Sequence, residues 1–160
     1  QCLIQLGTNA VRQGKVAGIN AAGGYATFPG VICSAVSKMF DIEVGATGIT
    51  ESQARACGFR VVSGTVTGKT RAEYFPGAKD IRVKIIADPY LGNVIGGQII
   101  AGEEVTQRVN MISMAIQKET NVLELSRADT AYAPPVNETW EPVTLAAEIA
   151  SMRIRRLSSR

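Results

Sequence analysis

Few side chains in this sequence could take part in catalysis or metal binding. The residue types that are absent exclude the most kinds of active site. The sequence has 160 residues, three cysteines and no histidine. A Ser-His-Asp or Cys-His catalytic arrangement is therefore impossible within this chain, and so is a histidine-based metal site. Cys2, Cys33 and Cys57 show no CxxC spacing. We therefore expect no metal site, and reduced thiols in a reducing, cytoplasmic compartment. Cys33 is expected to act as a small apolar side chain, whereas Cys57, near a helix end, is the thiol to test for reactivity.

Two tyrosines beside prolines are the remaining candidates for chemistry. Tyr74 precedes Phe75-Pro76-Gly77, and Tyr132 precedes Ala133-Pro134-Pro135. Taken alone, a tyrosine in such a setting is more often a packing residue, although a phenol can donate a hydrogen bond or a proton. A Walker A loop is excluded, because the segment ending in Lys69-Thr70 has Ser63 where that motif needs its first glycine.

Composition predicts one compact domain and argues against two classes of partner. Hydrophobic residues make up 46% and charged residues 19% of the chain, an ordinary globular balance. The net charge of +3 comes from the C-terminal end: four of the 17 basic residues lie in the last eight positions. A basic tail on a neutral body does not predict nucleic-acid binding. No apolar run approaches the roughly 20 residues that span a bilayer, so we expect no membrane partner. The opening at Gln1, without Met or a basic segment, is expected to be a cut inside a longer protein.

The elements that would position these residues begin with a helix over residues 8–23. Gly14 and Gly18 lie four positions apart on one face of it. Two glycines cost about 2 kcal/mol of helix propensity together. The helix is therefore predicted to pack very closely against something on that face, and a poorly packed terminal helix is the alternative.

An extended region is predicted from residue 31 to residue 49, with strand-like cores at 31–33 and 42–44. Thr50 and Gln53 then have the spacing of a capping box. The short helix that they begin is expected to end at Gly58, because glycine suits the left-handed position after a helix.

The centre of the chain is predicted to be a β-sheet, followed by helices. One strand covers 59–67, and a hairpin joins 81–87 to 93–100 across a Pro- and Gly-containing turn. Ala133-Pro134-Pro135 interrupts the helical C-terminal part, and Pro142 begins a last helix that runs toward Arg156. Apolar residues at helical spacing predict a buried stripe on the helix after Gly102: Val105, Val109, Ile112 and Ile116. Strands followed by helices predict an α+β fold with an antiparallel sheet.

Several segments, in order and with matching spacing, resemble one family, the pyridine nucleotide–disulfide oxidoreductases. Residues 6–23 resemble the end of the FAD domain of these enzymes, and the rest resembles their dimerisation domain. The segments that carry the likeness are Leu6-Gly7-Thr8, residues 12–23, Lys38-Met39-Phe40-Asp41, Thr47-Gly48-Ile49-Thr50-Glu51, Tyr74-Phe75-Pro76-Gly77-Ala78-Lys79, Tyr132-Ala133-Pro134-Pro135 and Trp140-Glu141-Pro142.

The resemblance implies a C-terminal fragment: residues 1–27 as the end of the FAD-binding domain and residues 28–160 as the dimerisation domain, a sheet with flanking helices. The similarity is greatest to the single-cysteine branch, which contains NADH oxidases, NADH peroxidases and coenzyme A disulfide reductases. The glutathione reductase branch carries a His-Pro pair near its C-terminus, and the corresponding stretch here is Tyr132-Ala133-Pro134-Pro135. This departure argues against a glutathione or lipoamide substrate.

The resemblance also implies a cofactor site at the N-terminus of the first helix. Leu6, Gly7, Thr8 and Asn9 would face the pyrimidine edge of FAD, where unpaired backbone N–H groups could stabilise negative charge. The redox cysteine and the NAD(P)H site of such enzymes would lie before Gln1. The fragment alone is expected to be inactive and to retain neither cofactor.

For the tyrosines, the resemblance implies a catalytic role in a homodimer. Tyr74 and Tyr132 would reach toward the redox cysteine of the partner subunit, where a phenol can hydrogen-bond or protonate a leaving thiolate. Oxygen, peroxide or a small disulfide would be the electron acceptor, with coenzyme A disulfide favoured and oxygen close behind. The alternative is a non-catalytic binding or structural α+β domain.

Overall fold

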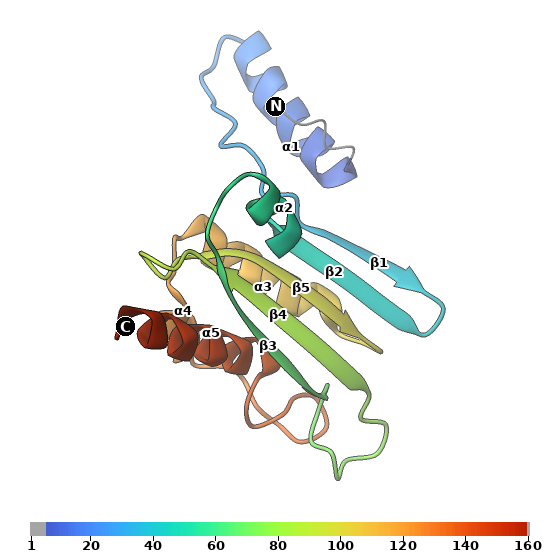
Figure 1. Ribbon diagram of the computed structural model, residues 1–160. Coiled ribbons are helices and arrows are strands. Elements are labelled where there is room, and N and C mark those ends of the chain that lie inside the picture. Colours follow the sequence, from blue (N-terminus) through green and yellow to red (C-terminus); the bar gives the residue numbers. More distant parts are fainter. Residues whose placement is uncertain (1–5, 160) are drawn as a thin grey trace. The chain divides into compact units, whose positions relative to one another are not determined.

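The computed structural model describes residues 6–159, and these divide into two compact units with the boundary between Cys33 and Ser34 (Figure 1). The predicted division between residues 27 and 28 stays a prediction. Cys2, predicted to be a reduced thiol, lies outside the described residues, as does Arg160 of the basic tail.

The first unit contains helix α1, Gly7–Ala21, close to the predicted range of 8–23. Gly23, with φ at +84°, follows the helix in the left-handed region that glycine adopts readily. The chain then turns back, and the Asn20 side chain accepts from Ala26 N–H at 2.8 Å and donates to Ala26 O at 3.0 Å. The Arg12 guanidinium lies 5.6 Å from the ring centre of Phe28.

The predicted strand core at 31–33 is wrong. These residues form no strand, and Cys33 is exposed with φ at +59°, a left-handed conformation that interrupts any extended run. The expectation that Cys33 acts as a small apolar side chain is not met, because the residue is exposed.

The second unit is built on one antiparallel sheet of five strands in the order β1-β2-β5-β4-β3. The strands are β1 (Ala35–Met39), β2 (Ile42–Gly48), β3 (Val62–Lys69), β4 (Asp80–Ala87) and β5 (Val94–Ala101). β1 and β2 form a tight hairpin across Phe40, whose φ is +54°. The hairpin of β4 and β5 is confirmed, with Val83 opposite Ile99. The antiparallel α+β prediction is thus confirmed.

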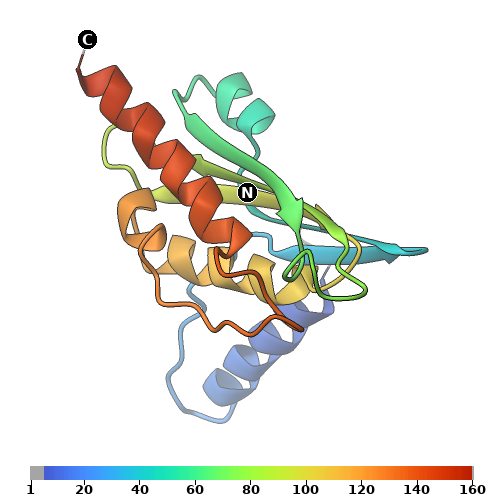
Figure 2. The same ribbon diagram turned by 90° about the horizontal axis from the view of Figure 1, so that it is seen from below.

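Four helices complete the second unit. They are α2 (Glu51–Ala56), α3 (Val105–Gln117), the short α4 (Val122–Leu125) and α5 (Pro142–Ser158). Helix α3 packs on β5, β2 and β1, whereas α5 packs on β3 and β4 and also contacts α4 (Figure 2). None of the helices in residues 6–159 is long and apolar enough to cross a bilayer.

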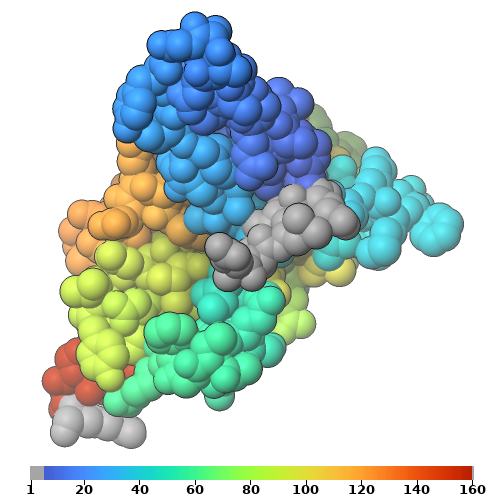
Figure 3. All heavy atoms as spheres, turned by 90° about the horizontal axis from the view of Figure 1, so that it is seen from above, coloured from blue at the N-terminus to red at the C-terminus, as the bar shows by residue number. Residues whose placement is uncertain are grey.

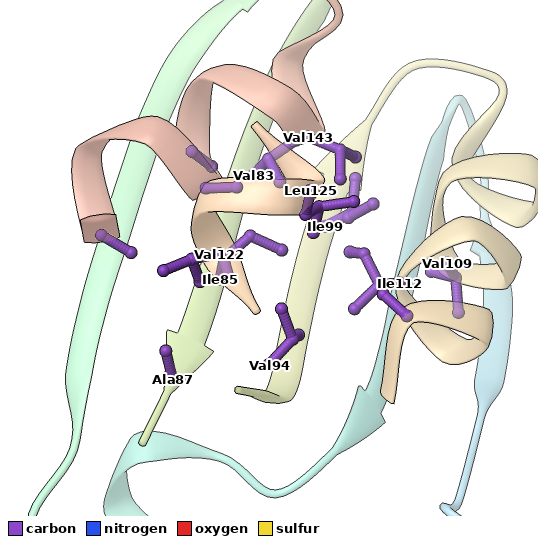
Figure 4. Packing of buried hydrophobic residues seen from close by; sticks show 14 of the residues in the cluster. Val83, Ile85, Ala87, Val94, Ile99, Val109, Ile112, Val122, Leu125 and Val143 are labelled. Atoms are coloured by element: carbon purple, nitrogen blue, oxygen red, sulfur yellow. The ribbon is translucent and has the colours of Figure 1, made fainter. Parts of the chain in front are cut away.

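The core lies between the sheet and helices α3 and α5 (Figure 4). Val83, Ile85 and Ile112 are fully buried, and each such side chain contributes about 1.5–3 kcal/mol by leaving water. Gly64 of β3 lets α5 approach closely, because a Cβ there would overlap the Ala146 carbonyl oxygen. Of the predicted stripe on α3, Val105, Val109 and Ile112 are buried, and Ile116 packs against the core from a partly buried position.

Apolar side chains are exposed at the tip of the hairpin of β1 and β2, which projects from the surface at the right of Figure 3. Phe40 is 96% and Met39 is 56% exposed. A shallow cleft of about 690 Å³ runs across neighbouring strands and is lined by Met39, Val44 and Ile100 among others. This surface is apolar without being part of the core.

Candidate functional site

The two candidate tyrosines lie on loops that leave the sheet and the helical layer separately. Tyr74 lies between β3 and β4, where Pro76 and Gly77, the latter with φ at +84°, make a turn. Tyr132 lies in the long connection between α4 and α5, where Pro134 and Pro135 prevent a helix. The two residues are 58 positions apart in the sequence.

The fold brings these two tyrosines together. Hydrogen bonding links the Tyr74 and Tyr132 side chains, and also the Thr139 and Tyr132 side chains. The bond to Tyr132 raises the pKa of Tyr74, because the donated proton is held in place. The bonds from Thr139 and then from Tyr74 lower the pKa of Tyr132, because both stabilise its phenolate.

Both phenols remain accessible. Tyr74 is 77% and Tyr132 is 48% exposed, so a large buried surface does not hold either ring. Because both hydroxyl-bearing rings are exposed, a phenol proton is available to a group outside the chain. The arrangement can donate a hydrogen bond, or a proton, to an anion that docks here.

The base of the Tyr74 loop is closed by hydrogen bonds around Thr70, which is fully buried. Its N–H donates to Lys79 O at 2.8 Å, and Lys79 N–H donates back to its Oγ1 at 3.1 Å. The Thr70 hydroxyl donates to Glu103 at 2.8 Å, and Arg71 donates to the same oxygen at 2.5 Å. Burial raises the pKa of Glu103, but the hydrogen bonds from Thr70 and Arg71 outweigh it and lower that pKa overall.

A buried ion pair supports the Tyr132 loop. Arg108 of α3 and Glu141, the N-cap of α5, are each 5% exposed. The guanidinium of Arg108 binds both carboxylate oxygens of Glu141, at 2.8 and 3.2 Å. Such a two-pronged contact fixes the relative orientation of both groups. It joins the N-cap of α5 to the first turn of α3.

The predicted cofactor residues lie at the start of α1. Leu6 occupies the N-cap position, and no side chain among the described residues caps the helix there. Gly7 and Thr8 are exposed, whereas Asn9 is buried. The N–H of Asn9 donates to Leu6 O at 3.1 Å. The expectation that this N–H is unpaired is therefore wrong, because the first turn closes on the N-cap carbonyl.

The uncapped end of α1 still fits an anionic group. A helix N-terminus carries a partial positive charge, and α1 has no acidic residue in its first turn to offset it. The residues present are therefore compatible with the electron-rich edge of a flavin. The chain places these residues and the tyrosines in different compact units.

Four residues of the site escaped the sequence reasoning: Thr139, Asn137, Glu141 and Arg108. A signal existed for Arg108, which lies three positions after Val105 and four before Ile112 on the apolar stripe of α3. A charged residue on a buried helix face needs a partner of opposite charge. Nothing local marks Glu141 as that partner, because 33 positions separate the two.

Comparison with protein families identifies the domain to which most of the second unit belongs. The family described as "Pyridine nucleotide-disulphide oxidoreductase, dimerisation domain" matches residues 34–144. This match covers more than half of the chain and includes both tyrosine loops.

Individual relatives agree with this match. The chain is 45% identical over 158 residues to an NADH oxidase of Methanocaldococcus jannaschii, covering 99% of this chain and 34% of that protein. It is 33% identical over 138 residues to a CoA-dependent NAD(P)H sulfur oxidoreductase of Pyrococcus abyssi, covering 86% and 31%. The structure of an NAD-dependent persulfide reductase from A. fulgidus superposes with a TM-score of 0.92 at 35% identity, covering 98% and 29%. The chain thus spans about a third of the length of the relatives that it matches.

Proposed function

The chain belongs to the pyridine nucleotide-disulphide oxidoreductases and contains their dimerisation domain, and on this premise we propose that it completes the active site of a partner subunit. The full-length protein would be an FAD-dependent NAD(P)H oxidoreductase that acts as a homodimer. The observation that carries the proposal is that Tyr74 and Tyr132 are both exposed on loops that the buried Arg108 joins through Thr70 and Asn137.

In this proposal the two tyrosines have different roles. Tyr132 offers its proton to the sulfur that leaves when the partner's redox cysteine attacks a disulfide. Tyr74 and Thr139 hold the Tyr132 side chain through their hydrogen bonds with it. A donor already placed at the site of developing charge lowers the barrier without reorganising during the reaction.

We propose a coenzyme A disulfide or a related sulfur compound as the electron acceptor. The paired tyrosines support this choice, and so do the CoA-dependent sulfur oxidoreductase and the persulfide reductase among the relatives. Oxygen is the second candidate, because the relative with 45% identity carries the name NADH oxidase.

The family implies FAD and NAD(P)H in the full-length protein. Leu6, Gly7, Thr8 and Asn9 would lie at the flavin, with the backbone N–H groups of Gly7 and Thr8 facing its electron-rich edge. When bound, FAD supplies the acceptor for a hydride from NAD(P)H. The role of this chain's own residues is then to hold and polarise that edge.

A surface around Trp140 supports the proposed homodimer. Trp140 is 67% and Met152 is 43% exposed, and both line a cleft of about 200 Å³ between α5 and the end of α4. Exposed aromatic and methionine side chains are enriched at protein–protein interfaces. A cytoplasmic location belongs to the same proposal, since the exposed thiol of Cys57 suits a reducing compartment.

The test uses the full-length protein with Tyr132→Phe, and with Tyr90→Phe as a control, since Tyr90 is similarly exposed at 74% and lies on another turn. Loss of a proton donor is expected to lower NADH-dependent coenzyme A disulfide reduction by roughly 10²-fold. Flavin reduction by NADH and the dimeric mass should stay unchanged. Normal disulfide turnover in intact Tyr132→Phe dimers would contradict the proposed role.

Two further measurements separate the alternatives. NADH turnover with oxygen alone, compared with turnover after adding coenzyme A disulfide, distinguishes an oxidase from a disulfide reductase. The full-length protein should also be yellow, with an absorbance that NADH bleaches. A colourless protein would instead support a structural or binding domain.

A further inference from the structure

One buried side chain reaches both tyrosine loops. The Nη2 atom of Arg108 donates to the carbonyl oxygen of Thr70 at 3.2 Å and to Oδ1 of Asn137 at 3.0 Å. Thr70 closes the base of the Tyr74 loop, and Asn137 lies within the Tyr132 loop. One guanidinium nitrogen therefore joins two segments that are far apart in the sequence.

Asn137 passes this contact on toward Tyr132. Its Nδ2 donates to the carbonyl oxygen of Ala131 at 2.9 Å, directly before Tyr132. Its Oδ1 accepts from Arg108 and also from the N–H of Glu138, at 2.9 Å. The amide thus uses its acceptor and its donor for different partners, a combination that neither Asp nor Ala can reproduce.

The guanidinium that makes these contacts cannot turn easily. Glu141 holds it with two hydrogen bonds, and Arg108 is 5% exposed. Glu104 adds a weaker contact at 3.6 Å from Nη1. Because the fork of Arg is planar and rigid, fixing one edge of it fixes the direction of Nη2.

The Tyr132 loop borders an open cleft of about 390 Å³, which Ala131, Val136 and Asn137 line from the loop side and Arg108 and Met111 line from α3. A loop beside a cleft depends on its hydrogen bonds rather than on packing.

We infer that Arg108 is a positioning residue that, through Thr70 and Asn137, sets the two tyrosine loops at the spacing that Tyr74 and Tyr132 need to act as a pair. The inference rests on the proposed function for its effect on turnover, whereas the geometry of the pair can be measured without turnover. A misplacement of about 1 Å at a reacting group can cost roughly 10²-fold in rate.

The experiment uses Asn137→Ala and Arg108→Lys in the full-length protein, with Asn110→Ala, an exposed asparagine of α3, as the matched control. Asn137→Asp is a further variant that keeps an acceptor for Arg108 but cannot donate to Ala131. Each variant is measured for coenzyme A disulfide reduction and for flavin reduction by NADH. The ionisation of Tyr132 is followed by tyrosinate absorbance, as the difference between each variant and the same variant carrying Tyr132→Phe.

We expect Asn137→Ala and Asn137→Asp to slow disulfide reduction by at least about tenfold, with flavin reduction unchanged. Tyr132 should titrate at higher pH in both, because the hydrogen bonds that stabilise its phenolate are lost. If Arg108→Lys folds, it is expected to slow disulfide reduction and to raise the titration pH of Tyr132 in the same way. If it does not fold, the two Asn137 variants alone test the inference. Asn110→Ala should match the parent protein in every measurement.

An unchanged Tyr132 titration in Asn137→Ala would overturn the inference, whatever the turnover. If the titration moves but Tyr132→Phe itself keeps normal disulfide turnover, the positioning role stands and the proposed function fails. A loss of flavin reduction equal to the loss of disulfide reduction would also overturn the inference, because it would indicate general structural damage.

Discussion

Helix α1 and the two tyrosine loops are both proposed to face a redox centre, but the chain supports them to very different degrees. A Cβ added at Gly14 or Gly18 would meet nothing within 4 Å in the described part of the chain. The tyrosine loops, by contrast, are joined through Arg108, whose contacts are buried and specific. Gly14 and Gly18 thus have no close neighbour among the described residues, whereas the two tyrosine loops are joined by contacts within them.

This difference shows which features of the two regions can be recognised in the sequence and which depend on the folded structure. Small residues on one face of a helix indicate that another surface can pack closely there. Their spacing can be recognised in the sequence before the fold is known. A pair of phenols held by a distant guanidinium exists only once the sheet and the helices have packed. Substitutions in the two regions should therefore differ in size and sometimes in sign.

The largest expected difference concerns Arg108→Met in this chain. Removing one member of a buried ion pair leaves Glu141 buried and unpaired, which should lower the free energy of unfolding by about 3–5 kcal/mol. Lys15→Met, on exposed α1, should change it by no more than about 0.5 kcal/mol. Urea unfolding followed by circular dichroism measures both. Similar values for the two variants would remove the contrast between the regions.

Glycine substitutions should differ in sign. Gly64→Ala forces a Cβ against the Ala146 carbonyl and should destabilise the chain by about 1–3 kcal/mol. Gly14→Ala, with open space around it, should stabilise α1 by about 0.5–1 kcal/mol through helix propensity. Thermal unfolding of the two variants, measured side by side, decides whether the signs differ.

The same Gly14→Ala change should be harmful in the full-length protein. If another surface packs closely on this face of α1, a methyl group there weakens flavin retention or shifts the flavin potential, and Thr8→Ala should act in the same direction. Flavin content after dialysis and redox titration measure both. Unchanged content and potential would leave α1 as a poorly packed terminal helix.

The smallest expected effect is a pH shift caused by Thr139→Val. Thr139 lowers the pKa of Tyr132, so the protonated phenol is lost at a lower pH than in a free tyrosine. Without the Thr139 hydroxyl the pKa of Tyr132 should rise. The alkaline limb of the pH–rate profile for disulfide reduction should then move to higher pH. Thr139→Ser keeps a hydroxyl and should restore the original limb. A limb that stays in place in Thr139→Val would mean that Tyr132 does not supply the proton.

Local rules predicted the elements that are governed by neighbouring residues. The capping box of Thr50 and Gln53 is present, with Gln53 N–H donating to Thr50 Oγ1 at 3.2 Å. Ile81, Val83 and Ile85 of the predicted hairpin alternate with Arg82 and Lys84, and all three apolar side chains are buried. The capping box of Asn121 and Glu124 at α4 followed the same rule and was overlooked. In each case the partners lie within a few positions, so the signal is contained in a short stretch.

Local rules failed where the backbone took an uncommon conformation. Residues 31–33 have strand-like composition, but Cys33 is left-handed, and the first strand begins at Ala35 instead. The sharp reversal at Phe40 was also unmarked, because neither glycine nor asparagine is present there. Pairing between β1 and β2 imposes that reversal on a residue with no preference for it.

The sequence by itself determined the composition of the site: no histidine, two tyrosines beside turn-forming prolines, and a glycine-containing first helix, in an order that resembles one family. Tertiary structure decided which of these residues meet. Tyr74 and Tyr132 come together because α3 presents a buried arginine to Thr70 and to Asn137 at once. Residue types and local periodicity follow from short-range sterics and hydrophobic pattern, whereas a hydrogen-bonded pair 58 positions apart depends on how the layers pack.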